Sequence, residues 1–500
     1  MPSEFLFDLL KSMTPGEKRY FKKKARGGQG RTGENYLELY DILDRSTTYD
    51  EESVKIAHSN PVYAANLSFG KNHLYNILLD TLSDYHAKSG NAQLEVARYW
   101  SKLQILLEKG LNKQAFKLIG QAKRHCQIYH LGFDHLKFLH TERNLISRFE
   151  TKGARKKLDA LVAVCEELHS HLSMEMQIIT LYERYFLAHR TEKPEKRKAA
   201  MDKFEAFCRE NEHYFSGNPS FHSLVFFNFT RAMNFEIEQN YRMHKFHVGK
   251  ILELYDRDER VRAANLERYL NMLANYLGSS LLVEETTRED FQRLFERMEQ
   301  IRTDSPKLQV RLLHNSLYFK LLVDLRFRQF VQASRLDKAI FEFLAKYSGN
   351  LALDRVLTYK YHMGVAHFGA AMEDPAEKEE HLSGAIRWFL EIENQSKFET
   401  KSTLRSFTRL YFILAHFDLG AEEFVGNRIR AYLTYLKKEK KTGSIEHTIL
   451  SGIKKVVSSK TPEQRLKHME TIAEKIPQTQ QFELLVDWVN EKVNAFRKLV

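Results

Sequence analysis

The sequence predicts an all-α protein: a right-handed superhelical array of antiparallel helix pairs, with a helical domain before it and a helical cap after it. Three observations predict this fold class. The chain has only 9 Pro and 22 Gly in 500 residues, and its many Leu, Lys, Glu, Arg and Ala residues favour long helices. Apolar residues return with helical spacing along most of the chain. No segment sustains the period-two alternation with β-branched residues that is typical of strands.

The three cysteines mark a pattern that recurs about every forty residues. Cys126, Cys165 and Cys208 each follow apolar residues by four and by seven positions. These offsets lie on one stripe of an α-helix, so each cysteine is expected to face a core. Helical stripes that return at this period are typical of stacked helix pairs, which present an extended surface. With no Cys-x-x-Cys pair, the thiols predict a reducing compartment and no disulfide framework.

Residues 1–90 are predicted to form a separate, basic helical domain. Thr14 to Glu17 has the form of a capping box with Pro15 at the first helical position, and it starts a helix that runs to about residue 24. The glycine-rich segment 26–33 is predicted to be a flexible loop. Helices are expected to follow near residues 35–45, 51–57 and 65–86.

Residues 91–441 are predicted to form the array itself, as about eight helix hairpins. Short connectors that contain Gly, Pro, Asn or Asp separate the helices, for example at Gly110, Gly153, Pro194 and Gly420. The tail, residues 442–500, is predicted to add three helices that cap the open end of the array.

The last predicted helix has a clear apolar stripe. Phe482, Leu485, Trp488 and Val489 have the spacing of residues on one helix face. We expect these side chains to point into the core of the cap.

One hairpin resembles the tetratricopeptide repeat family. Gly110 precedes Ala115 by five residues, and Ala122 follows seven later, which matches the small residues through which the paired helices of that family pack closely. The resemblance extends over residues 91–441, although the period of about forty exceeds the usual thirty-four. The opening from Lys11 to Phe21 is similar to a group of uncharacterised bacterial helical-repeat proteins. Both resemblances imply a helical fold and no particular activity.

The chain carries 77 basic and 65 acidic residues, a formal net charge of +12. An excess of this size permits anionic partners without requiring them. The N-terminus lacks the apolar core of a secretory signal, and the longest stretch without charged side chains, residues 213–230, contains a turn. We therefore predict a cytoplasmic protein with no membrane partner.

The sequence contains no recognisable catalytic, cofactor-binding or metal-binding constellation. Gly28 to Gly33 has the glycine spacing of a phosphate loop, but Glu34 and Asn35 stand where Lys and Ser or Thr would be needed. His244 and His247 are spaced like two metal ligands, without a carboxylate pair beside them. We expect no enzymatic activity, no cofactor and no metal; a site assembled from distant repeats remains open.

The basic N-terminal segment is the clearest set of candidate contact residues. Clustered Lys and Arg side chains beside a glycine-rich loop can neutralise phosphates or contact an acidic partner. Within residues 11–31 only Glu17 is acidic. The candidate phosphate or partner contacts are Lys18, Arg19, Lys22, Lys23, Lys24, Arg26 and Arg31.

Two functions are therefore open at the level of the sequence. The first is a non-enzymatic protein-interaction scaffold that offers an extended groove to a peptide or helix of a partner protein. The alternative is a regulatory factor that associates with nucleic acid through the basic N-terminal domain.

Overall fold

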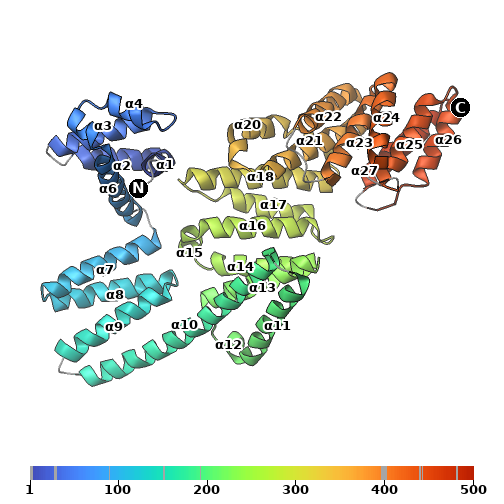
Figure 1. Ribbon diagram of the computed structural model, residues 1–500. Helices are drawn as coiled ribbons and strands as arrows, with labels where there is room; N and C mark the ends of the chain where they lie inside the picture. The colour runs from blue at the N-terminus through green and yellow to red at the C-terminus, as the bar shows by residue number, and fades with distance from the viewer. Residues whose placement is uncertain are drawn as a thin grey trace. The chain divides into compact units, whose positions relative to one another are not determined.

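The computed structural model describes residues 4–26, 31–88, 91–149, 153–191, 193–395, 402–438, 441, 443–479 and 482–500. Within these residues every regular element is a helix, which confirms the predicted all-α class. Within each unit, many consecutive helices pack as neighbours (Figure 1). Among the described helices, none combines the length and the apolarity that crossing a bilayer requires.

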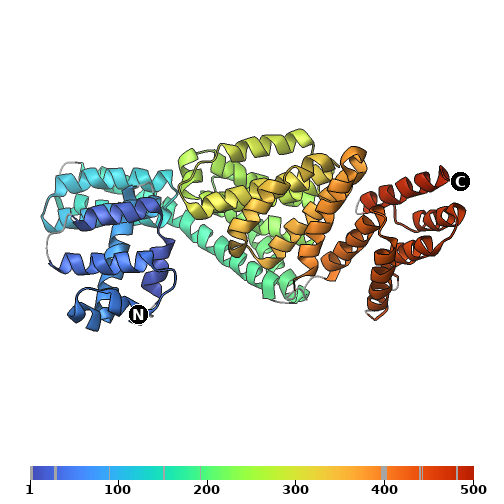
Figure 2. The same cartoon turned by 90° about the horizontal axis from the view of Figure 1, so that it is seen from above.

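The chain divides into two compact units, and the first comprises residues 1–280 and 303–308. Figure 2 shows its N-terminal helices, in blue, as a small bundle. The helices from its start are α1 (Phe5–Ser12), α2 (Pro15–Arg26), α3 (Arg31–Arg45), α4 (Glu51–Ala57), α5 (Pro61–Ala65), α6 (Leu67–Lys88), α7 (Ala92–Glu108), α8 (Asn112–Ile128), α9 (Gly132–Phe149), α10 (Ala154–Thr191), α11 (Pro194–Glu210), α12 (Glu212–Ser216), α13 (Phe221–Ile237), α14 (Tyr241–Asp256), α15 (Glu259–Ala264) and α16 (Leu266–Leu281).

The second unit comprises residues 281–302 and 309–500. The predicted boundaries at residues 90 and 441 each lie within one of these units and stay predictions. The remaining elements are α17 (Arg288–Glu299), α18 (Pro306–Arg326), α19 (Phe330–Ser334), α20 (Asp337–Tyr347), η1 (Ser348–Asn350), α21 (Leu353–Glu373), η2 (Pro375–Glu377), α22 (Lys378–Glu393), α23 (Ser402–Asp418), α24 (Glu422–Lys438), α25 (Ile445–Ser458), α26 (Pro462–Ala473) and α27 (Glu483–Arg497).

The predicted start of α2 is confirmed. The backbone N–H of Thr14 donates to Oε2 of Glu17 at 2.5 Å, and the N–H of Glu17 donates to Oγ1 of Thr14 at 3.3 Å. This reciprocal pair is a capping box. The predicted loop 26–33 is too long, because α2 continues to Arg26 and α3 begins at Arg31; residues 27–30 lie outside the described residues.

The helix predicted over 65–86 begins later in the structure, because Asn66 separates the short helix α5 from α6, which starts at Leu67. Asn60 caps the short helix α5: its side-chain oxygen accepts hydrogen bonds from the N–H groups of Val62 and Tyr63, both at 3.1 Å. The local N-cap therefore starts a separate turn before α6.

The three cysteines are buried, as predicted. Cys126 lies in α8, Cys165 in α10 and Cys208 in α11. Helix α10 contains no Gly or Pro over its 38 residues. It therefore joins the second helix of one pair to the first helix of the next without a connector.

Five connectors between described helices share one geometry. In each, a residue with positive φ ends the helix, its N–H reaches a carbonyl three residues back, and the next N–H reaches one five back. This Schellman arrangement satisfies carbonyls that the helix end leaves free. The positive-φ residues are Gly110, His130, Gln239, Arg328 and Gly420.

Helices α21 and α22 pack closely through glycines. A Cβ atom on Gly364 would lie 2.3 Å from Cε1 of Phe389, and one on Gly384 would lie 2.6 Å from Nδ1 of His367. Phe389 is fully buried in the same core. Because contacts this short do not occur, the two helices approach to a distance that only glycine permits at these positions.

We expect Gly364→Ala to lower the free energy of unfolding of the second unit by about 1–3 kcal/mol, because the buried Phe389 ring has to move. This cost exceeds the gain of about 1 kcal/mol in helix propensity. The control is Gly426→Ala in α24, where the nearest neighbour of the added methyl is Cγ1 of Val457 at 4.0 Å. Urea unfolding followed by circular dichroism measures both variants, and equal stabilities would contradict the close approach.

Candidate functional site

The C-terminal helix α27 contacts α23, a helix that precedes it by more than sixty residues. The ring of Phe482, just before α27, lies 6.1 Å from the ring of Phe407 near the start of α23. The ring of Trp488 lies 5.9 Å from that of Phe417 at the end of α23. Side chains of the first half of α27 therefore contact α23, while the backbone of α27 packs against α26.

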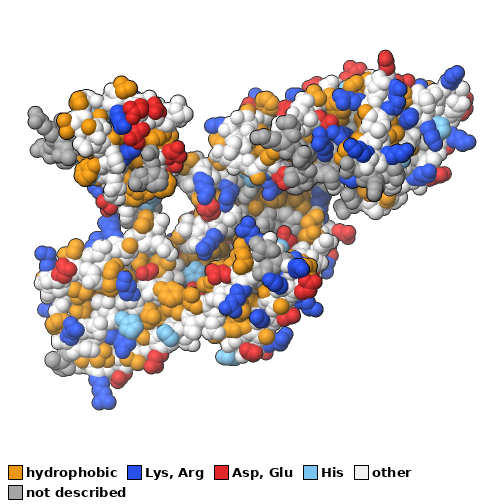
Figure 3. All heavy atoms as spheres, in the orientation of Figure 1, with side chains coloured by type: hydrophobic (Ala, Val, Ile, Leu, Met, Phe, Trp, Pro, Cys, Tyr) orange, Lys and Arg blue, Asp and Glu red, His pale blue; other side chains and the backbone are white. Residues whose placement is uncertain are grey.

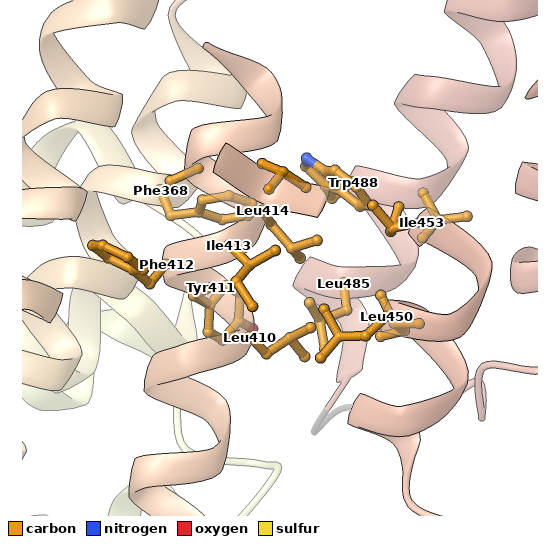
Figure 4. Packing of buried hydrophobic residues seen from close by; sticks show 14 of the residues in the cluster. Phe368, Leu410, Tyr411, Phe412, Ile413, Leu414, Leu450, Ile453, Leu485 and Trp488 are labelled. Carbon is orange, nitrogen blue, oxygen red and sulfur yellow. The ribbon is translucent and has the colours of Figure 1, made fainter. Parts of the chain in front are cut away.

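The apolar face of α27 is fully enclosed. Leu485, Trp488 and Val489 are each 0% exposed, which confirms the inward stripe that the sequence predicts. Figure 4 shows Leu485 and Trp488 between Leu410 to Leu414 of α23 and Leu450 and Ile453 of α25. The last helix is therefore part of the central core of this unit.

A second face of α27 is acidic. Glu483, Asp487 and Glu491 follow one another at intervals of four residues, so they share one stripe of the helix. Arg328 pairs with Glu483 at 3.4 Å and also with Asp487, while Nζ of Lys378 lies 3.1 Å from Oε1 of Glu491. The two cations come from the α18–α19 connector and the start of α22.

A buried carboxylate joins α23 to α27. The side chain of Asp418, the last residue of α23, is 2% exposed, and Nζ of Lys492 lies 2.9 Å from its Oδ1. The indole N–H of Trp488 donates to Oδ2 at 3.1 Å, and Nζ of Lys378 lies 4.0 Å away. Burial raises the pKa of Asp418, while the lysines oppose that rise.

We call the surface that receives this helix the α27-binding surface. Its chemistry suits an amphipathic helix, because an apolar floor is bordered by cations that meet an acidic stripe. It consists of Phe407, Leu414, Phe417 and Asp418 of α23, Leu450 and Ile453 of α25, Arg328 and Lys378, together with α26, which packs directly against α27.

The sequence contains a recognisable pattern for α27 but none for the cations that bind it. The acidic residues of α27 repeat every four positions and Trp488 lies on the apolar stripe, so the helix itself can be recognised. Arg328 and Lys378 precede their partners by more than a hundred residues. Nothing local in the sequence marks them.

A cavity of about 480 Å³ lies beside α20, α21 and α22. At its wall, Oδ2 of Asp337 accepts hydrogen bonds from Arg387 at 2.5 Å and from the indole of Trp388 at 3.2 Å, and it lies 2.6 Å from Nε2 of His367. Burial alone would raise the pKa of Asp337, but the hydrogen bonds from His367 and Trp388 hold that pKa below its ordinary value. The carboxylate therefore fixes three side chains on α21 and α22.

Part of the predicted basic cluster is engaged in ion pairs. Nζ of Lys18 lies 2.6 Å from Oδ1 of Asp44, and Nζ of Lys22 lies 2.8 Å from Oδ1 of Asp41 on the same helix, α3. Each pair joins α2 to α3. These contacts give the two lysines a role in holding the bundle together.

The remaining candidates differ from one another. Lys24 pairs with Asp84 of α6 at 2.5 Å. Arg19 and Lys23 are exposed. The side chains of Arg26 and Arg31 lie outside the described residues. On the face drawn in Figure 3, acidic side chains stand beside basic ones over the N-terminal bundle, so its charge is mixed there.

No family model matches the chain, and neither a curated protein nor a solved structure does. The resemblance to the tetratricopeptide repeat family and to bacterial helical-repeat proteins therefore stays a prediction.

We expect Asp418→Ala to destabilise the second unit by about 3–5 kcal/mol, because it removes the buried carboxylate that Lys492 and the indole N–H of Trp488 share and leaves Lys492 with Glu491 alone. The control is Glu470→Ala, which breaks the exposed pair with Arg497 and should change stability by less than about 1 kcal/mol. Urea midpoints report both variants. Equal midpoints would mean that the buried pair contributes no more than a surface pair.

Proposed function

We propose that this protein is a non-enzymatic interaction scaffold that binds an amphipathic helix of a partner protein at the α27-binding surface. The observation that carries the proposal is the packing of α27 itself. Its apolar stripe packs on apolar side chains of α23 and α25, and its acidic stripe pairs with Arg328 and Lys378. This packing is an intramolecular example of helix-in-groove recognition. The proposal includes a right-handed, tetratricopeptide-like array, and a cytoplasmic setting suited to its free thiols.

The apolar stripe and the acidic stripe have different tasks. Full burial of a Leu or Val side chain contributes about 1.5–3 kcal/mol, so the apolar stripe provides most of the binding free energy. Exposed ion pairs contribute at most about 1 kcal/mol each. The pairs with Arg328 and Lys378 therefore select the orientation and the sequence of the helix more than they strengthen its binding.

The partner that fits is an amphipathic helix with two features. Its apolar face carries a large aromatic residue at the place of Trp488, with an N–H that reaches Asp418. Its flank carries carboxylates at intervals of four residues, which meet Arg328 and Lys378. Such a helix has to compete with α27, whose effective concentration on its own chain is in the millimolar range.

The test uses the full-length chain and a fluorescein-labelled peptide of residues 482–500. Replacing Glu483, Asp487 and Glu491 of the chain by Lys places like charges beside Arg328, Lys378 and Lys492, which should loosen α27 without altering a residue of the α27-binding surface. We expect the peptide to bind this variant at least about tenfold tighter than wild type, a change of about 1.4 kcal/mol. Fluorescence anisotropy measures both affinities, and circular dichroism verifies the fold.

The matched control adds Arg328→Glu to the triple variant. Its carboxylate attracts the new lysines of α27 and repels the acidic peptide, so the gain in affinity should disappear. A peptide with the three acidic residues changed to Lys should bind the triple variant poorly. The proposal is overturned if wild type and triple variant bind the acidic peptide equally, or if both peptides bind alike.

A second function, association with nucleic acid through the N-terminal helices, is favoured by Arg19 and Lys23. Both are exposed, and neither forms an ion pair with a described residue. If they contact phosphates, Arg19→Glu combined with Lys23→Glu should weaken binding to duplex DNA and lower the slope of log K against log salt by about two units. Wild type that does not bind DNA at low salt, or an unchanged slope, would contradict this function.

A further inference from the structure

The turn between α21 and α22 brings together three metal-ligating side chains. Asp374 directly follows α21, the short helix η2 (Pro375–Glu377) comes next, and His381 lies on the first turn of α22. One ligand atom from each of Asp374, Glu377 and His381 lies within 4.8 Å of the others. Two carboxylates and one imidazole therefore converge on a single point.

Local geometry explains this convergence. Oδ1 of Asp374 accepts a hydrogen bond from the N–H of Ala376 at 3.0 Å, which fixes the carboxylate at the start of η2. Glu377 and His381 are four residues apart across one helical turn, so their side chains share a face. Nε2 of His381 lies 3.8 Å from Oε2 of Glu377.

His381 is the unusual member of the cluster. It is only 7% exposed, and neither of its ring nitrogens has a hydrogen-bond partner within the described residues. Buried polar atoms without partners are rare, because the lost hydration is not replaced. An ion at the convergence point would give one of these nitrogens a ligand bond.

A second histidine lies beside the cluster. The ring of His367 lies 5.7 Å from that of His381, and His367 is already bound to Asp337. One nitrogen of His367 is therefore engaged outside the cluster, and Asp374, Glu377 and His381 remain the three converging groups.

We propose that Asp374, Glu377 and His381 form a binding site for a divalent transition-metal ion such as Zn²⁺. One imidazole nitrogen with carboxylate oxygens suits Zn²⁺ and its neighbours in the first transition row, whereas Ca²⁺ and Mg²⁺ prefer oxygen ligands alone. Ligand bonds of about 2.0–2.2 Å require the three groups to close slightly on the ion. The exposed side chain of Glu377 is able to move for this purpose.

The site has a route to solvent and a structural consequence. His381 and Glu380 line the 480 Å³ cavity that also contains Asp337 and His367, so an ion and its remaining water ligands can reach the imidazole. A bound ion would join the end of α21 to the start of α22. Because an ion that binds only the folded chain stabilises that chain, the ion should raise the melting temperature.

The test titrates the full-length, chelator-treated chain with ZnSO₄ by calorimetry, and with CoCl₂ by visible absorption, which reports ligand geometry. We expect a site that His381→Gln and Glu377→Gln each weaken at least about tenfold, the size of effect that altered metal environments give. Glu380→Gln, the neighbouring acid outside the cluster, and His416→Gln, a half-buried histidine on α23, should leave that affinity unchanged.

Thermal unfolding with and without Zn²⁺ provides a second readout. Wild type should gain stability with Zn²⁺, and Glu377→Gln should not; this variant alters an exposed side chain, so the fold is expected to persist. The proposal is overturned if His381→Gln and Glu377→Gln bind Zn²⁺ like wild type, if the two control variants lose as much affinity, or if Zn²⁺ leaves the melting temperature of wild type unchanged.

Discussion

The arrangement of the second unit depends on the burial of Trp488. Its indole N–H needs an acceptor once the ring is enclosed by α23 and α25, and Asp418 provides it. The buried carboxylate then needs a cation, which is Lys492. Lys378 lies near the same carboxylate and pairs with Glu491. The burial of one aromatic ring thus connects charges on α22, α23 and α27.

In the same unit, the indole N–H of buried Trp388 also donates to a carboxylate, but there the pKa of the carboxyl group shifts in the opposite direction. Asp337 and Asp418 each accept a hydrogen bond from a buried indole. Asp337 is the first residue of α20, where the helix dipole favours a negative charge, whereas Asp418 is the last residue of α23, where the dipole opposes it. Hydrogen bonds from His367 and Trp388 hold the pKa of Asp337 below its ordinary value, whereas deeper burial raises the pKa of Asp418. Asp418 therefore depends more strongly on its lysines.

Features set by neighbouring residues were predictable from the sequence. The helical class, the capping box at Thr14 and the inward stripe of α27 all follow from spacing within a few residues. The helix start at Asn60 was missed, and so were the positive-φ connectors at Gln239 and Arg328; these two connectors lack the glycine that usually marks a helix end.

Features set by distance along the chain were not predictable. The cations that meet α27 come from Arg328 and Lys378, and the carboxylates that pair with Lys18 and Lys22 come from α3. A single sequence does not reveal which distant charges meet. Glu377 and His381 did have a local signal, their spacing of four residues, but the turn that brings Asp374 to them is a property of the fold.

The two proposals meet at the start of α22. Glu377 is a proposed metal ligand, and the next residue, Lys378, forms the ion pair with Glu491 of α27. An ion that fixes Glu377 restricts the backbone from which Lys378 reaches α27. If both sites exist, binding of the ion makes the attachment of α27 more favourable. By linkage, the attached α27 makes binding of the ion more favourable by the same free energy. A partner helix that displaces α27 but keeps an acidic residue opposite Lys378 retains this coupling, whereas a helix without that residue loses it. The turn between α21 and α22 would thereby favour the same acidic pattern that the α27-binding surface recognises.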